Sequence, residues 1–136
     1  MKTAELTGAL LDYWTARAEG VPAEQLEIRP VQRPDTRTPD TICVRRNPVR
    51  DPIIGHDEVR MQYSTSWHHG GPLFERHGMG VVKFYEPVDG PIAVGFEWAA
   101  LSLDDKHRED GPTPLIAICR AVVRAAFGDE VEDLPC

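Results

Sequence analysis

The chain has 136 residues, of which 41 % are hydrophobic and 27 % charged, and its formal net charge is −7. This length and composition are those of one soluble globular domain, residues 1–136, whose core is large enough to fold without a metal or a disulfide. The negative charge argues against broad nucleic-acid binding, because it repels phosphates at long range.

The first predicted element is a helix over residues 3–19. Apolar side chains recur at helical spacing from Leu6 to Tyr13, which is typical of an amphipathic helix. Thr3 is placed to accept a backbone N–H in the first turn, and Gly20 is a natural residue for the helix end. We therefore expect this helix to bury one face against the rest of the chain.

The following stretch, residues 22–57, is rich in proline and arginine. Between positions 29 and 50 it carries six arginines against two aspartates, a local charge of +6 − 2 = +4. Because prolines interrupt regular structure, we expect this part of the domain to be partly irregular. We interpret the arginines as surface side chains that pair with acidic residues near the C-terminus.

Four segments then show apolar residues at every second position, which predicts strands. These segments are residues 42–44, 58–63, 81–85 and 92–98. The last one has the clearest pattern, because its apolar side chains from Ile92 to Trp98 all lie on one side. Alternation of this kind indicates a sheet that is covered on one face only, which favours antiparallel pairing.

The last predicted element is a helix that begins at Pro114 and ends before Gly128. Thr113 is a natural N-cap, and the missing N–H of Pro114 costs nothing at the first helical position. The apolar stripe of this helix consists of Leu115, Ile118, Cys119, Val122 and Ala126. Arg120 and Arg124 are four positions apart, and we expect them on the solvent face.

The order helix, strands, helix defines the predicted fold class. It is α+β, with one antiparallel sheet covered on one face by the N-terminal and the C-terminal amphipathic helix. Two such helices are enough to cover the apolar face of a sheet, and the other face is left to solvent or to a partner.

The three cysteines, Cys43, Cys119 and Cys136, have no regular spacing. Their odd number and the lack of an apolar signal segment favour a reducing compartment. No part of the sequence approaches the roughly 18 apolar residues that a membrane span requires. We therefore expect a cytoplasmic protein that makes no membrane contact.

Three blocks of sequence resemble the phage NinX-like family, whose members are small phage and prophage proteins. The blocks are AELTGALLDYW at residues 4–14, YSTSWHHGGPLFER at 63–76 and GPTPLIAICRAVVRAAFGDEV at 111–131. They come in the family's order and cover about a third of the chain, whereas residues 22–57 lie outside the resemblance. The resemblance implies a phage-derived gene and a bacterial cytoplasm, and it implies no activity and no catalytic residue.

The middle block is the predicted recognition segment, which we interpret as a loop. Its candidate binding residues are Tyr63, Ser64, Ser66, Trp67, Gly70, Gly71, Glu75 and Arg76. Tyrosine, tryptophan and arginine are the residue types favoured at binding hot spots. We expect a tight Gly-Gly-Pro turn followed by a short strand, with both serines capping backbone groups. Trp67 is expected to cover one end of the core.

Catalytic and metal-binding alternatives have weaker support. His68, His69 and His77 are weak metal-ligand candidates, because adjacent residues of an extended chain point to opposite faces and no known zinc motif is present. A serine near a histidine suggests acyl transfer, but the Gly-x-Ser-x-Gly sequence of a nucleophile elbow is missing. We expect no metal and no cofactor.

The leading hypothesis is a non-enzymatic accessory protein of phage origin that binds an unknown protein partner or itself. The first alternative is a small-anion or nucleotide-binding domain that uses the Gly70-Gly71 turn and the helix end at Thr113. The second alternative is an enzyme or metal site built on the histidines.

Overall fold

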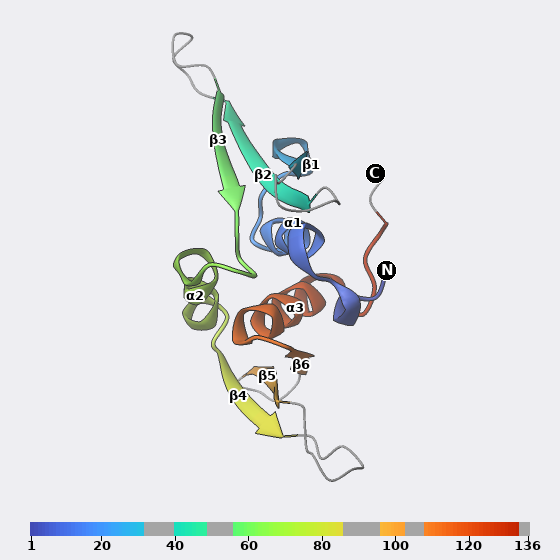
Figure 1. Cartoon of the computed structure of the whole chain (residues 1–136), viewed down its shortest axis with the longest axis vertical. Coiled ribbons are helices and arrows are strands. Elements are labelled where there is room, and N and C mark those ends of the chain that lie inside the picture. Colours follow the sequence, from blue (N-terminus) through green and yellow to red (C-terminus); the bar gives the residue numbers. More distant parts are fainter. Residues whose placement is uncertain (32–39, 49–55, 86–95, 103–107, 134–136) are drawn as a thin grey trace.

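The structure is a computed structural model that describes residues 1–31, 40–48, 56–85, 96–102 and 108–133 (Figure 1). Its helices are α1 (Gly8–Ala18), α2 (Trp67–Arg76) and α3 (Pro114–Phe127). Its strands are β1 (Leu26–Val31), β2 (Asp40–Pro48), β3 (His56–Met61), β4 (Met79–Tyr85), β5 (Phe96–Ser102) and β6 (Arg108–Gly111). Residues 92–95 of the predicted strand and Cys136 lie outside the described residues.

The described strands form two antiparallel sheets. One has the order β1-β2-β3 and the other the order β4-β5-β6. The predicted α+β class and the antiparallel pairing are confirmed, but the single sheet of the prediction is divided into two. The division falls at helix α2, which separates β3 from β4 along the chain.

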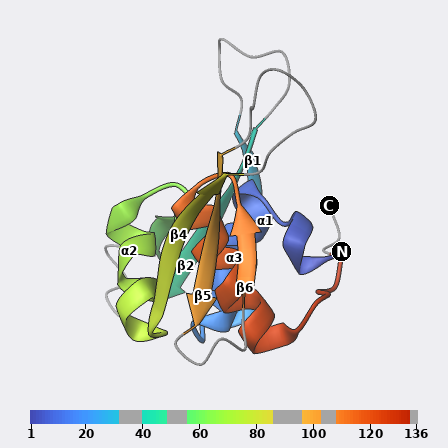
Figure 2. The ribbon, with the colours of Figure 1, turned by 90° about the horizontal axis from the view of Figure 1, so that it is seen from below.

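Each sheet packs on a different helix. α1 contacts the strands of the first sheet, α3 contacts those of the second sheet, and the two helices contact each other in the middle (Figure 1). Figure 2 shows β4, β5 and β6 lying across α3, with α2 beside them. The core therefore lies along the α1–α3 pair, and its largest fully buried apolar side chains are Leu6, Leu11, Leu73, Ile118, Val122 and Val123.

Helix α1 begins at Gly8, later than predicted, because Thr3 belongs to a separate 3-10 turn, Thr3–Glu5. The hydroxyl of Thr3 donates to the Gly128 carbonyl at 2.7 Å, so it ties the two ends of the chain together and does not cap α1. Gly8 has a φ of +59°, a conformation that side chains other than glycine adopt at a cost. The backbone therefore takes a left-handed conformation at Gly8, the first residue of the helix.

Strand β2 turns Cys43 toward the core, with Met61 of β3 opposite it. Ile42 and Val44 share a face, as predicted, but it is the face turned away from Cys43. Val44 is nevertheless only 4 % exposed. Four charged side chains on this outer face form a network of ion pairs around it, namely Glu27, Arg29, Arg46 and Glu58.

Helix α3 has the predicted start. The Thr113 hydroxyl oxygen accepts the Ile116 N–H at 3.1 Å, and Pro114 is the first helical residue. The predicted stripe is buried except for Ala126, which is exposed in the last turn. Arg120 is half-buried and not on the solvent face, because its side chain folds toward the N-terminal segment.

Candidate functional site

The predicted recognition segment, residues 63–76, forms a turn followed by a helix. Helix α2 begins at Trp67 and ends at Arg76, so the Gly-Gly-Pro sequence at residues 70–72 lies inside it. The predictions of a tight turn and of a following strand are therefore wrong. Local turn signals failed here because the segment is held in place by packing against α3 and β4.

Gly70 lies where α2 approaches the preceding turn and α3. A Cβ at this position would overlap the Tyr63 carbonyl oxygen and lie 2.7 Å from Leu115 Cδ2. One turn further on, Leu73 is 1 % exposed and belongs to the core. The N–H of Gly70 donates to the Ser66 carbonyl at 2.8 Å, so it cannot join a nest of N–H groups for an anion. The alternative anion site at the Gly-Gly-Pro sequence thus has no geometric basis.

Trp67 lies on the outer side of α2 and is 57 % exposed. Its ring stacks on that of Phe74, with centroids 5.7 Å apart and planes 17° from parallel. A Cβ on Gly71 would be 3.7 Å from Trp67 Cε3, so the indole lies along the helix beside this glycine. The prediction that Trp67 covers the core is wrong. We call the surface formed by Trp67, Gly71 and Phe74 the aromatic face of α2.

The turn before α2 is held by groups other than the predicted serine side chains. Ser66 is the N-cap residue, but no cap hydrogen bond reaches its side chain from the described residues. Ser64 is buried, and its backbone N–H donates a hydrogen bond to Oδ1 of Asp12 at 2.8 Å. The Gln62 N–H donates to Nδ1 of His69 at 3.1 Å, which assigns the ring proton to Nε2.

Asp12 is the buried acid that binds this turn, and it was not among the residues singled out from the sequence. It is 6 % exposed and lies between the buried Leu11 and Tyr13 in α1. Burial raises the pKa of its carboxyl, while the hydrogen bond from the Ser64 N–H and the charge of Arg60 oppose part of this rise. The available signal was an acidic residue flanked by apolar ones within a predicted helix.

The three candidate histidines lie at different places. The ring of the exposed His68 is 5.5 Å from that of His69, at the start of α2. His77 follows the other end of this helix, about 13 Å further along its axis. Within the described ranges, no three histidine, cysteine, aspartate or glutamate side chains are grouped to hold a metal ion.

The remaining predicted site residues also point in different directions. Tyr63 is half-buried against the core, where burial raises the pKa of its phenol. Glu75 is exposed. Arg76 pairs with Glu19 at 3.1 Å, and the Nε2 atom of His77 lies 3.1 Å from the same carboxylate. These contacts join the end of α2 to the end of α1.

Two cysteines of the described chain, Cys43 and Cys119, are free and buried. Burial raises the pKa of the Cys43 thiol to about 12, and it raises that of Cys119 as well. Since the thiolate is the reactive form, neither side chain is suited to nucleophilic chemistry at neutral pH.

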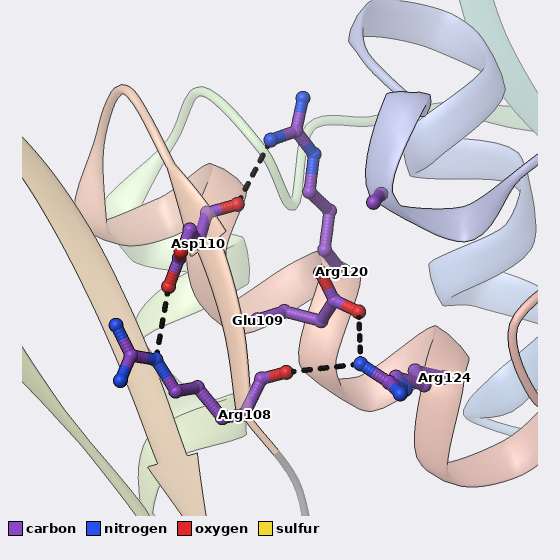
Figure 3. A pocket seen from close by; sticks show the side chains of 6 residues that line it. Arg108, Glu109, Asp110, Arg120 and Arg124 are labelled. Carbon is purple, nitrogen blue, oxygen red and sulfur yellow. Dashed lines mark hydrogen bonds and ion pairs between the residues drawn. The ribbon is translucent and has the colours of Figure 1, made fainter.

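A second candidate site lies apart from α2, where β6 meets α3 (Figure 3). It is a cavity of about 550 Å³, which we call the arginine cavity. Its lining residues are Ala4, Arg108, Glu109, Asp110, Arg120 and Arg124. All but Ala4 are charged types, so the cavity is suited to a polar ligand.

Hydrogen bonds fix the two α3 arginines of this cavity. Arg120 donates from Nε to the Leu6 carbonyl at 3.0 Å and from Nη1 to the Asp110 carbonyl at 2.9 Å. Arg124 donates from Nη1 to Oε1 of Glu109 at 2.8 Å (Figure 3). Glu109 is only 8 % exposed, so this pair is partly shielded from water.

The arginine cavity was not predicted from the sequence. Arg120 and Arg124 were expected on the solvent face, whereas both are half-buried. Arg108 comes from β6, where its Nε donates to Oδ1 of Asp110 at 3.2 Å. The spacing of four between the α3 arginines was visible, but their meeting with β6 depends on the tertiary fold.

The fold and these sites define the molecule as a small α+β domain with a polar cavity and an exposed aromatic helix face. Its sequence matches the family model described as Bacteriophage P22, NinX, over residues 2–125. The chain therefore belongs to the NinX family of bacteriophage P22. The match also extends across residues 22–57, so the likeness is wider than the three blocks that first indicated it.

A comparison with curated proteins gives no match. Among the described helices, none combines the length and the apolar character needed to cross a bilayer.

Proposed function

We propose that this NinX-family protein is a non-enzymatic accessory protein that recognises another protein through the aromatic face of α2. The observation that carries the proposal is the exposure of Trp67. More than half of this indole is in contact with water, although burying a tryptophan is strongly favourable. An exposed, ordered tryptophan is the residue type most often found at the centre of a binding surface.

The aromatic face is packed against its own helix. Trp67 is stacked on Phe74, and α2 itself is anchored by the close approach at Gly70 and by the buried Leu73. A side chain that is held in its bound conformation loses little conformational entropy on binding. This packing supports a recognition role for the face.

Polar side chains flank the aromatic face on one side of the helix, where they can act as part of a polar rim. His68 and Glu75 are exposed on this flank, whereas Arg76 lies on the opposite side of α2 and pairs with Glu19. A carboxylate and an imidazole beside the two aromatic rings suit a partner that has an apolar pocket with a polar rim. The occupant in this proposal is a protein surface, and a second copy of the chain is one such surface.

The test compares Trp67→Ala with Phe127→Ala. Phe127 is the matched control, because it is also an exposed aromatic residue, 39 % accessible, with one ring contact, to Trp14. We expect the unchanged protein to form a dimer or to capture a defined partner from host lysate, measured by light scattering and pull-down. Trp67→Ala should abolish this association, and Phe127→Ala should retain it.

Two outcomes would refute the proposal. One is association that Trp67→Ala leaves intact. The other is a monomer that captures no partner at all from lysate of the phage-infected host. Far-UV circular dichroism of each variant checks that the fold is kept.

The proposal places the protein in the cytoplasm of a bacterial host. The grounds are the phage family, the odd number of cysteines, and the free state of Cys43 and Cys119. Fractionation of infected cells tests it, with recovery in the cytoplasmic fraction as the expected result.

A further inference from the structure

We propose that the partner of the aromatic face of α2 is a second copy of the chain, whose own α2 lies antiparallel across a two-fold axis near Gly71. This inference rests on the proposed recognition function, and it names the occupant of the same face. The observation that carries it is that the exposed side of α2 is complementary to itself when the direction of the helix is reversed.

Two residue pairs form this exposed side of α2. The members of each pair are seven positions apart, almost two full turns, so they lie on the same side of the helix. The aromatic pair is Trp67 and Phe74, whose rings stack on each other. The polar pair is His68 and Glu75, and both are exposed. The polar pair begins one residue later, so it lies about 100° further around the helix, with Gly71 between the two flanks.

A two-fold axis makes each flank meet its own counterpart. The axis reverses the direction of the helix, but it leaves each flank on its own side. Trp67 therefore comes opposite Phe74 of the second copy, and the aromatic flanks pack together. On the polar flank, His68 comes opposite Glu75 of the second copy, so that an imidazole faces a carboxylate. Each of these contacts occurs twice, as in every isologous interface.

The centre of this arrangement falls at Gly71, which has no side chain to hold the two helices apart. Outside the helix backbone and the adjoining residues, an added Cβ would contact only Trp67 among the described residues, at 3.7 Å. Packed helices have axes about 8–10 Å apart, depending on the side chains at the contact. A glycine at the crossing point therefore allows the close approach that brings both flanks into contact.

The formal net charge of −7 on each copy does not prevent this association. At about 0.15 M salt the Debye length is about 8 Å, so charges far from the interface are screened. Near the interface, the polar flank places one imidazole against each carboxylate. Two helices of about three turns bury a small area, so we expect a reversible dimer whose fraction rises with protein concentration.

The experiment is sedimentation velocity of the whole chain at about 0.15 M salt and at protein concentrations up to about 1 mM. We expect the wild type to pass from the mass of one chain to twice that mass as its concentration rises. A monomer at every concentration overturns the inference, and the proposed function survives if that monomer captures a host protein through Trp67. A dimer that Trp67→Ala leaves intact overturns both.

Exchange of charges tests the antiparallel arrangement. His68→Glu places two carboxylates opposite each other at both contacts, so it should weaken dimerisation by at least about tenfold. Adding Glu75→Lys puts a lysine opposite each new carboxylate, and it should return the dissociation constant to within about threefold of the wild type. Both positions are exposed, so the fold is kept.

The matched control adds Glu24→Lys to His68→Glu. Glu24 is an exposed acid outside α2, so its substitution changes the net charge by the same amount as Glu75→Lys. This control should stay as weak as His68→Glu alone. A dissociation constant that His68→Glu leaves unchanged, or a rescue by both lysines or by neither, overturns the inference.

Discussion

Gly70 and Gly71 are neighbours in α2, but their surroundings are opposite. At Gly70 a side chain has no room, because the Tyr63 carbonyl and Leu115 occupy the space. At Gly71, apart from the adjoining residues and the backbone of the helix itself, the nearest atom to an added Cβ is in Trp67, at an ordinary contact distance of 3.7 Å. Gly70 therefore permits close packing between α2 and its neighbours, whereas Gly71 mainly lowers the helix propensity of the segment.

We expect Gly70→Ala to lower the free energy of unfolding by about 1–3 kcal/mol, as overpacking does in a dense core. Gly71→Ala should change it much less, because the helix preference of alanine is offset by the crowding of its Cβ against the ring of the following Pro72. Urea denaturation of both variants measures the difference. Equal effects of the two substitutions would show that the close approach at Gly70 is absent in solution.

At the scale of elements, Asp12 links α1 to the turn that precedes α2. Its carboxylate accepts the Ser64 N–H while lying in a buried position. Burial raises the pKa of this carboxyl in the folded state above its value of about 3.9 in the unfolded chain. The folded state therefore binds a proton more tightly, and this group's contribution to stability is lost as pH rises from about 4 through the raised pKa.

We expect Asp12→Asn to remove this pH dependence. The amide oxygen of asparagine can still accept the Ser64 N–H, and it carries no charge that must be buried. The variant should match the wild type near pH 4 and be more stable at pH 7. Unfolding measured from pH 4 to pH 8 gives the test, and parallel curves for the two proteins would contradict it.

The sequence predicted some elements well and others poorly, for physical reasons. Helix α3 was predicted with its cap at Thr113, because the cap and the apolar period are both local. Helix α2 was missed, because Gly70 and Pro72 are local turn signals that packing overrides. The direction in which Val44 faces was left open, since alternation shows that two faces differ but not which one meets the core.

The candidate site was predictable only in part. Trp67 was named from the sequence as a candidate recognition residue, and this role stays a prediction, whereas its predicted place over the core was wrong. The arginine cavity was not predictable, because it depends on β6 and α3 meeting through contacts such as that of Arg120 with Leu6. Residues far apart in the sequence leave no shared local pattern.

At the scale of the whole molecule, the α1–α3 pair is the only core that the described part of both sheets shares. Leu11 of α1 and Ile118 of α3 are both fully buried in it. The prediction of one domain over residues 1–136 therefore has a direct consequence. Damage to α3 should weaken the sheet on α1 as much as the sheet on α3 itself.

We expect Ile118→Ala to lower the free energy of unfolding by about 2–5 kcal/mol, as cavity-forming substitutions of buried isoleucine do. Hydrogen exchange of amides in β2 and in β5 should lose protection to the same extent. Loss confined to β5 would mean two independently unfolding halves, contrary to the single-domain prediction.

The tryptophans give the molecule an optical reporter of its own. Trp14 is 6 % exposed, whereas Trp67 is 57 % exposed, so iodide in solution should quench the fluorescence of Trp67 far more than that of Trp14. A protein that binds to α2 would shield Trp67 from water and shift its fluorescence emission to shorter wavelength. Occupation of the aromatic face can then be followed without a label.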